Sequence, residues 1–357
     1  MAVTEWKEYE GESGICYTHS ALKLLQDLAA FHRVQAAPRV LAITGSNGKT
    51  TVTTLLGEMA RKDDRHVGVG GNIGTPALDL LDQGCDLYVL ELSSFQLESL
   101  SSLKPIAATV LNISADHMDR YAGLDDYAQA KARIFSGAAT AVMNRDDRHV
   151  MAMPAEGEQV FFSLHTPQAD NEFGISEIHG QQWLCRGKQK LCATDELLIP
   201  GKHNMANALA ALALGQAAGL SMTAMLTALK SFAGLPHRTQ FVAEVEAVKY
   251  YNDSKATNVG ACSAALTGLD KGDSSRTVVI LGGDCKEADF SGLTGIVRDT
   301  CRAVVLMGRD AAQIKIHLPD TVAIQTAADM ASAVKQARQF ARSGDRVLLS
   351  PACASFD

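Results

Sequence analysis

The sequence predicts an α/β protein built from two doubly wound, mostly parallel sheets. Apolar runs alternate with helical stretches between residues 38 and 145, and the same alternation returns after residue 240. A glycine-rich loop follows the first apolar run, in the order strand, loop, helix that a phosphate-binding loop needs. We therefore expect a central domain of the phosphate-loop type over residues 38–235 and a Rossmann-like second domain over 236–357.

The loop itself follows a predicted buried strand at 40–43 and precedes a helix predicted from 49 to about 61. Its residues are Gly45, Ser46, Asn47, Gly48, Lys49, Thr50 and Thr51. Glycines let backbone N–H groups turn toward an anion at the helix N-terminus, Lys49 can reach outer phosphates, and the Thr50 hydroxyl can ligate Mg²⁺. The full phosphate-loop pattern has glycine where this chain has Ile43, so an ordinary turn before a helix is the alternative interpretation.

Further strands are predicted at 67–69, 87–92, 106–111 and 139–143, and ligands of such sheets lie at the carboxyl ends of strands. Three candidates follow these strands: Asn72 in a glycine-rich turn, Glu91 between two leucines, and His117. A bound metal would compensate a carboxylate that is buried like Glu91. The alternatives are a loop without a ligand for Asn72, a helix N-terminal glutamate for Glu91 and a structural histidine for His117. The next predicted helix, 124–135, places Tyr127 and Lys131 on one face, where a lysine is usually solvated.

Residues 146–200 change to short alternating runs, which indicate a small antiparallel insertion. An Ala/Leu-rich helix is then expected to about residue 218, with Asn204 and Asn207 near its start either as caps or as nucleotide ligands. Residues 234–238 have the composition of a hinge. Six strands are predicted beyond it, at 242–245, 249–252, 277–281, 303–307, 322–325 and 346–349. Simple turn chemistry explains the glycine and aspartate at their ends, but not so many lysines and arginines.

Composition restricts the class of protein. The 357-residue chain has a net charge of −7, which argues against nucleic acid and anionic membrane as partners. Its eight cysteines have no zinc-like spacing and fit a reducing cytosol, and the longest Ala/Leu-rich stretch is too short to span a bilayer. Residues 1–37 have no apolar signal core and are expected to form at most one helix, over 20–31, and a tail. We expect a cytoplasmic monomer.

Taken in order, the strings at the strand ends resemble the Mur ligases of peptidoglycan (cell wall) synthesis, from about residue 38 to the end. They are the loop 44–51 and the segments 70–72, 91–96, 116–121, 203–207, 236–238, 252–258 and 350–355. The segments Glu-Leu-Ser-Ser-Phe-Gln, His-Met-Asp-Arg-Tyr and Asn-Asp-Ser-Lys-Ala-Thr-Asn resemble those family members that add D-glutamate to UDP-N-acetylmuramoyl-L-alanine.

The resemblance implies an ATP-dependent amide ligation through an acyl phosphate. Residues 45–51 would cradle ATP, with Lys49 on the transferring phosphate. Thr50 and Glu91 would hold one Mg²⁺, and His117 with a carbamylated Lys131 would hold a second. Asn72 and His117 would contact the muramoyl substrate. The remaining implied ligands are Asn204, Asn207, Arg238 and Asp253 for the nucleotide, and Lys255, Thr257, Lys286, Ser355 and Phe356 for D-glutamate.

The resemblance also implies parts that the sequence does not show. The family carries an N-terminal domain that grips uridine diphosphate, and residues 1–37 are expected to be only a remnant or linker; the final helix of the last domain is also expected to be cut. Two alternatives are a weakly active or inactive nucleotide-binding remnant, and a ligase like folylpolyglutamate synthase, which needs no uridine domain. The His-Met-Asp-Arg-Tyr segment argues against the latter.

Overall fold

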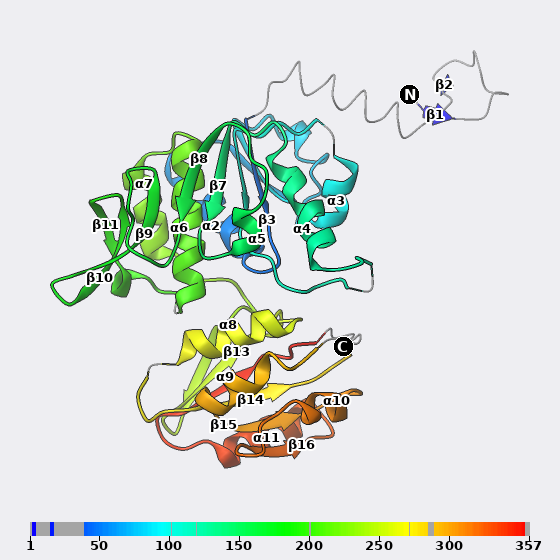
Figure 1. The fold of residues 1–357 in the computed structure, drawn as a ribbon, viewed down its shortest axis with the longest axis vertical. Helices are drawn as coiled ribbons and strands as arrows, with labels where there is room; N and C mark the ends of the chain where they lie inside the picture. The colour runs from blue at the N-terminus through cyan, green and yellow to red at the C-terminus, as the bar shows by residue number, and fades with distance from the viewer. Residues whose placement is uncertain are drawn as a thin grey trace.

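The computed structural model describes residues 39–100, 102–118, 120–199, 201–270, 272–284 and 289–353, and two short strands before them. These strands, β1 (Ala2–Thr4) and β2 (Ile15–Tyr17), pair in parallel. The helix expected over 20–31 lies outside the described residues. The remainder forms two α/β bodies, one above the other in Figure 1, each around its own sheet.

The first body carries a nine-stranded sheet in the order β11-β10-β9-β8-β7-β6-β3-β5-β4 among the described residues. Its strands are β3 (Arg39–Thr44), β4 (Val67–Gly71), β5 (Leu87–Glu91), β6 (Ala107–Val110), β7 (Thr140–Asn144), β8 (Glu158–Phe162), β9 (Glu172–Ile178), β10 (Gln181–Arg186) and β11 (Gln189–Ala193). Its helices are α2 (Lys49–Lys62), α3 (Ser94–Ser99), α4 (Leu124–Ala132), α5 (Arg148–Met151), α6 (Lys202–Ala217) and α7 (Met222–Ser231), with short 3₁₀ turns η2 (Leu81–Gln83), η3 (Arg133–Phe135) and η4 (Thr194–Glu196).

The apolar side chains of β3 point alternately to the two faces of this sheet, which explains why helices cover both faces. Leu41 and Ile43 pack in a core with residues of α2, α6 and α7. Val40 and Ala42 point the other way, into a core with residues of α3 and α4. All four side chains are buried, as expected for the central strand of a doubly wound sheet. The carboxyl end of β3 therefore lies at the middle of the sheet edge.

The strands expected as a small antiparallel insertion are present, but they continue the central sheet. β8 pairs with β7 in parallel, β9 pairs with β8 in parallel, and antiparallel pairing begins only between β9 and β10. The helix α6 packs against β6, β7, β8 and β9, so that Phe162 and Phe173 join the same core as Leu41. Burial under α6 thus keeps these strands on the sheet.

The second body contains a six-stranded sheet in the order β12-β13-β17-β14-β15-β16 within the described part of the chain. The strands are β12 (Gln240–Val245), β13 (Val248–Asn252), β14 (Thr277–Leu281), β15 (Cys301–Leu306), β16 (Ala323–Thr326) and β17 (Arg346–Leu349). β12 is antiparallel to β13 and the other pairs are parallel. Core residues of α8 (Val259–Leu269), α9 (Leu293–Thr300) and α10 (Ala311–Ile316) cover one face, and those of α11 (Met330–Phe340) cover the other.

The two bodies meet near the phosphate loop. The expected domain boundary at 235/236 falls in the segment between α7 and β12. Helix α6 contacts α8, Arg238 Nη2 donates to Thr50 Oγ1 (2.9 Å), and Asn258 Nδ2 donates to Asn47 Oδ1 (3.4 Å). Polar contacts between the bodies are thus made by the loop that the sequence singled out. No helix among the described residues has the length and apolar character needed to cross a membrane.

Candidate active site

The turn between β3 and α2 has the backbone geometry of an anion-binding loop. Gly48 is the N-cap of α2 and is left-handed, with φ of 84°. A Cβ there would lie 2.4 Å from Asn207 Oδ1, and one on Gly45 (φ 145°) would lie 3.0 Å from Leu111 Cβ. Both positions therefore need glycine. The loop is fastened to the segment after β6, because Asn47 N donates to Asn112 Oδ1 (2.8 Å) and Ser114 N to Ser46 Oγ (2.9 Å).

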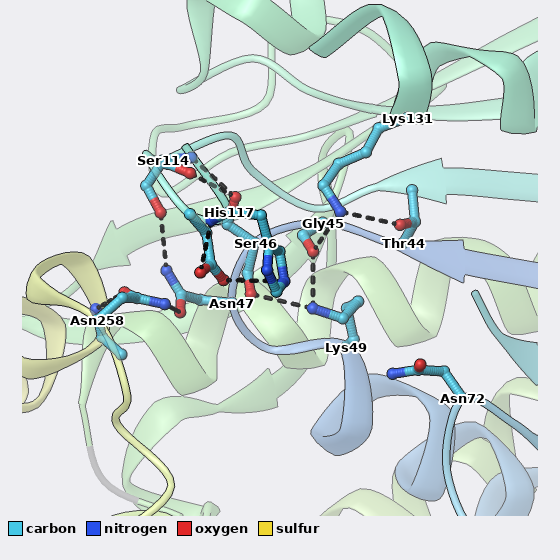
Figure 2. Close-up of polar contacts among 12 residues, drawn as sticks. Thr44, Gly45, Ser46, Asn47, Lys49, Asn72, Ser114, His117, Lys131 and Asn258 are labelled. Atoms are coloured by element: carbon cyan, nitrogen blue, oxygen red, sulfur yellow. Dashed lines mark hydrogen bonds and ion pairs between the residues drawn. The ribbon is translucent and has the colours of Figure 1, made fainter. Parts of the chain in front are cut away.

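Lys49 lies over its own loop. Its Nζ donates to the carbonyl oxygens of Gly45 (2.8 Å) and Ser46 (3.0 Å), as Figure 2 shows. Burial lowers its pKa, and the nearby carboxylate of Glu91 opposes that shift. A cation held in this way can swing from carbonyl oxygens to the oxygens of a bound phosphate with little loss of interaction.

Glu91, the last residue of β5, has one unsatisfied carboxylate oxygen. The side chain is 2% exposed. Asn72 Nδ2 donates to its Oε1 (3.0 Å), whereas its Oε2 is buried and has no hydrogen-bond partner among the described residues. A buried carboxylate oxygen without a donor is costly unless a cation meets it. Oxygen is also the ligand that Mg²⁺ prefers, so the site fits this ion, with Thr50 at the start of the adjoining helix.

Lys131 is buried beside the same loop. It is 2% exposed, and its Nζ donates to Gly45 O (3.1 Å) and Thr44 Oγ1 (3.4 Å) and lies 4.5 Å from the centroid of the Tyr127 ring. Burial is the largest cause that lowers the Lys131 pKa, to about 7, and repulsion from Lys49 is the second largest. The two lysines thus share one carbonyl oxygen (Figure 2), and the amine of Lys131 is partly neutral near pH 7.

His117 lies in a cluster of rings with Phe95 and Tyr127. Its φ is 56°, its ring centroid is 4.9 Å from that of Phe95 and 6.5 Å from that of Tyr127, and the side chain is 47% exposed. Close by in the chain, Arg120 Nη2 and Tyr121 Oη both donate to the Glu98 carboxylate. The described residues hold no cluster of three or more His, Cys, Asp or Glu with metal-binding geometry. A metal here would need the Thr50 hydroxyl, substrate oxygens or a modified lysine as well.

A cavity of about 330 Å³ lies between the two bodies, next to the loop. Residues of the loop and of α6 line one side, and residues of the second sheet line the other. The lining includes Asn47, Gly48, Thr51, Asn204, Asn207, Arg238, Asp253 and Lys255. This volume lies in the range of small-molecule sites.

Three of the lining residues are held by specific contacts. Asn207 Nδ2 donates to Asn204 Oδ1 (3.3 Å). Asp253 accepts from Thr239 N (2.8 Å) and Ser350 Oγ (2.9 Å), and its burial raises its pKa to about 6. Because Thr239 N and Ser350 Oγ hold its carboxylate in place, Asp253 presents a fixed acceptor at the cavity wall.

The residues expected around D-glutamate are only partly placed. Lys255 and Thr257 are exposed at the end of β13, and Lys255 lines the cavity described above. Lys286, Ser355 and Phe356 lie outside the described residues. Among the described residues, Lys49 and Lys131 thus meet at the loop, the expected nucleotide residues Asn204, Asn207, Arg238 and Asp253 line the adjoining cavity, and only Lys255 and Thr257 of the expected D-glutamate set are placed.

Several residues beside the loop were not selected from the sequence. Asn112, Ser114 and Asn258 each contact Asn47 or Ser46. The ring of Tyr127 lies between Lys131 and His117. Asn112 and Ser114 follow β6, so the rule that ligands lie at carboxyl ends of strands could have found them. The sequence places Tyr127 on the same helix face as Lys131, but nothing in that spacing separates a site residue from a core residue.

Each of the two bodies matches a known protein family. The family model described as "Mur ligase middle domain" matches residues 43–215, and "Mur ligase, glutamate ligase domain" matches 237–353. The chain is 52% identical over 337 residues to the UDP-N-acetylmuramoylalanine–D-glutamate ligase of Pseudomonas aeruginosa, covering 94% of this chain and 75% of that protein. The enzyme of the same name from Nitrosococcus oceani is 50% identical over 338 residues, with 94% and 74% covered.

Solved structures have the same fold. A MurF ligase from Thermotoga maritima in complex with ADP superposes with a TM-score of 0.73 at 17% identity, covering 97% of this chain and 84% of that one. A bifunctional folylpolyglutamate synthase/dihydrofolate synthase from Yersinia pestis gives 0.70 at 20% identity, with 98% and 93% covered. At these identities the likeness concerns the fold alone.

Proposed function

The chain belongs to the Mur ligase family, and we propose on that premise that it joins D-glutamate to UDP-N-acetylmuramoyl-L-alanine at the expense of ATP. The relatives that carry this activity in their names are 50–52% identical to it over 94% of its length. The observation that carries the proposal is structural: Lys49, Lys131 and the unsatisfied oxygen of Glu91 surround one loop beside a cavity between two domains.

The reaction brings anions together, and the site supplies the opposing charge. A carboxylate oxygen of the acceptor attacks the γ-phosphorus of ATP, the bond to the bridging oxygen breaks, and ADP leaves with the electron pair. The amine of D-glutamate then attacks the acyl carbon, releasing phosphate and a proton. Such transfers depend on positioning and charge stabilisation, which Lys49 and the N-terminus of α2 provide.

Magnesium would be held at the edge of the loop by Thr50 and Glu91, where it would neutralise phosphate charge. In the present structure Arg238 donates to Thr50 Oγ1 (2.9 Å), and the charge of Glu91 acts on Arg238 without a direct ion pair among the described residues. Arg238 would be displaced toward the nucleotide when the metal binds.

Lys131 would act as an anion rather than a cation. Its amine, with a pKa near 7, can attack CO₂ and lose a proton, which leaves a carbamate at the position of the ammonium. The burial that makes the amine neutral is the support for this modification. With His117, the carbamate would hold a second Mg²⁺.

The remaining substrate contacts are assigned from the resemblance to the family. We assign Asn72 and His117 to the muramoyl substrate and Asn204, Asn207, Arg238 and Asp253 to the nucleotide. Lys255, Thr257, Lys286, Ser355 and Phe356 are assigned to D-glutamate. In domain terms, 38–235 binds ATP and 236–357 binds the amino acid.

The cellular setting follows from the reaction. ATP and a nucleotide sugar are cytoplasmic substrates, and the six described cysteines, Cys85, Cys185, Cys192, Cys262, Cys301 and Cys353, are all free, as in a reducing compartment. We propose a cytoplasmic monomer that uses these small molecules and binds neither nucleic acid nor membrane.

A phosphate-release assay with UDP-N-acetylmuramoyl-L-alanine, D-glutamate, ATP and Mg²⁺ tests the function. Phosphate should appear only when all components are present, and mass spectrometry should show the amide product. L-Glutamate or a folate acceptor in place of the natural partner should give no product. Release that is independent of D-glutamate, or amide formation with a folate acceptor alone, would refute the proposal.

A further inference from the structure

A second cavity lies at the opposite end of the C-terminal sheet and takes no part in the proposed reaction. Its volume is about 650 Å³. It is lined by Glu244, Ala247, Lys249, Tyr251, Asp273, Ser274, Ser275, Arg302, Arg342, Ser343, Gly344, Asp345 and Arg346. Arg346 begins β17, whereas Ser350 just beyond its end bonds to Asp253 in the nucleotide cavity. At about 3.3 Å per strand residue, Arg346 and Ser350 lie roughly 13 Å apart along the strand.

Arg346 is a buried cation that its surroundings do not satisfy. The residue is 3% exposed. Its Nη2 donates to Ser275 O (2.9 Å) and to Ser275 Oγ, and the nearest carboxylate in an ion pair, Asp273, is 3.9 Å away and 55% exposed. Its Nε and Nη1 have no hydrogen-bond partner in the described part of the chain. A buried guanidinium with unused donors normally has an anion as its counterpart.

The most buried carboxylate of the cavity cannot serve as that anion. Asp345 accepts from Arg276 N (2.9 Å) and Arg302 Nη2 (2.9 Å) through Oδ1, and from Arg342 N (2.8 Å) and Arg302 Nε through Oδ2. Four donors therefore saturate its two oxygens. Of the other acidic residues that line the cavity, Glu244 is exposed on the edge strand β12 and faces Lys249 in the strand register.

We propose that this cavity binds an oxyanion, the phosphate or carboxylate group of a small metabolite, against Arg346. Lys249, Arg342 and Ser274 line the same cavity, and their residue types match that chemistry. The volume admits a molecule larger than the anion alone. The proposal concerns a site of its own and does not rest on the ligase activity.

Thermal melts of the Lys49→Ala variant, in which phosphate binding at the active-site loop is weakened, test the proposal with inorganic phosphate and with malonate as separate probes. We expect at least one of them to raise the melting temperature in a concentration-dependent manner. A response to phosphate identifies a phosphate-bearing ligand, and a response to malonate alone identifies a carboxylate. No response to either probe overturns the proposal.

Replacing the guanidinium separates binding from a structural role. Arg346→Met in the Lys49→Ala background should weaken anion binding by about tenfold or more. It should also raise the melting temperature in anion-free buffer, because it removes a buried, partly unpaired charge. A purely structural arginine would give the reverse pattern, a lower melting temperature and an unchanged response to anion.

Arg298→Met is the matched control, since Arg298 is 58% exposed, pairs with neighbouring Asp299 and lies outside the cavity lining. Its response to the anion should equal that of Lys49→Ala alone. If Arg346→Met does not fold, Lys249→Gln takes its place, and an unchanged anion affinity in that variant overturns the proposal.

Discussion

At the residue scale, two lysines with different surroundings meet at one carbonyl oxygen. Lys49 Nζ lies 2.8 Å and Lys131 Nζ lies 3.1 Å from Gly45 O. Lys49 is only half-buried by its own loop, whereas Lys131 is enclosed under Tyr127. Burial lowers the pKa of both amines, so the difference between them is one of access: Lys49 stays partly exposed toward a phosphate, whereas Lys131 is enclosed.

Lys49→Ala should lower the rate of ATP consumption in the complete assay by about 10²- to 10³-fold, the usual cost of one preorganised transition-state donor. Phosphate release measured with all substrates present checks this expectation. Lys62→Ala is the control, because Lys62 ends the same helix and is exposed. A Lys49→Ala rate equal to that of Lys62→Ala would contradict the assigned role.

Lys131→Met should change stability in a pH-dependent manner. Burial depresses the folded-state pKa of Lys131 from 10.5 to about 7. Below pH 7 the folded protein bears a buried ammonium, so the variant should be the more stable protein there. Between pH 7 and 10.5 the folded amine is neutral while the unfolded chain still binds the proton, and the advantage should shrink by up to about 1.4 kcal/mol per pH unit.

Urea unfolding in CO₂-free buffer from pH 6 to pH 10 measures this difference. Lys62→Met, at an exposed position of α2, should show no such pH dependence. A Lys131→Met difference that stays constant over the range would mean that the amine is not depressed by burial.

The residue-level site was partly predictable. Lys49, Thr50 and Glu91 come together because the carboxyl ends of adjacent parallel strands share one edge, and β3 pairs with β5 in that register. The burial of Lys131 could not be predicted, since a lysine on a helix is normally solvated and only the packing of α4 on the sheet encloses it. Its role rested on the family resemblance alone.

At the element scale, part of the Glu-Leu-Ser-Ser-Phe-Gln segment is explained by helix capping. Ser93 is the N-cap of α3: its Oγ accepts from Gln96 N (3.3 Å), and Gln96 Oε1 accepts from Ser93 N (2.9 Å). This capping box fixes the turn directly after Glu91. Ser93 and Gln96 thus have a local structural role at the end of β5.

Ser93→Ala should therefore destabilise the protein by about 1 kcal/mol, the typical cost of losing an N-cap. Chemical denaturation at neutral pH measures the loss. Ser99→Ala, at the exposed end of the same helix, removes only a bond to Gln96 O and should cost less. Equal effects from the two substitutions would argue against the cap.

Element positions were more predictable than their pairing. The strands expected at 277–281 and 346–349 have the same bounds as β14 and β17. The parallel pairing of β8 with β7 was not foreseen, because short alternating strands usually form hairpins. It depends on α6, an Ala/Leu helix buried over most of its length, and such a long-range contact leaves no local pattern.

At the scale of the whole molecule, the residues proposed to bind the nucleotide and the substrates belong to two bodies whose relative position matters. The loop lies in the first, Asp253 and Lys255 lie in the second, and both line the cavity of about 330 Å³. Besides the packing of α6 against α8, two hydrogen bonds printed for the described residues cross it: Arg238 with Thr50, and Asn258 with Asn47. An interface of this kind allows the bodies to move when charge is added between them.

Nucleotide and substrate should draw the two bodies together about the segment 234–238. Mg²⁺ and triphosphate would replace the Arg238–Thr50 contact with more and stronger bridges between the loop and the second sheet, and closure of such sites commonly completes the catalytic set. Small-angle X-ray scattering should show a smaller radius of gyration with Mg²⁺, a non-hydrolysable ATP analogue and UDP-N-acetylmuramoyl-L-alanine than without them. Lys49→Ala should contract less under the same conditions. An unchanged radius in the parent protein would mean that the bodies are already at their catalytic separation and that the hinge has no part in the reaction.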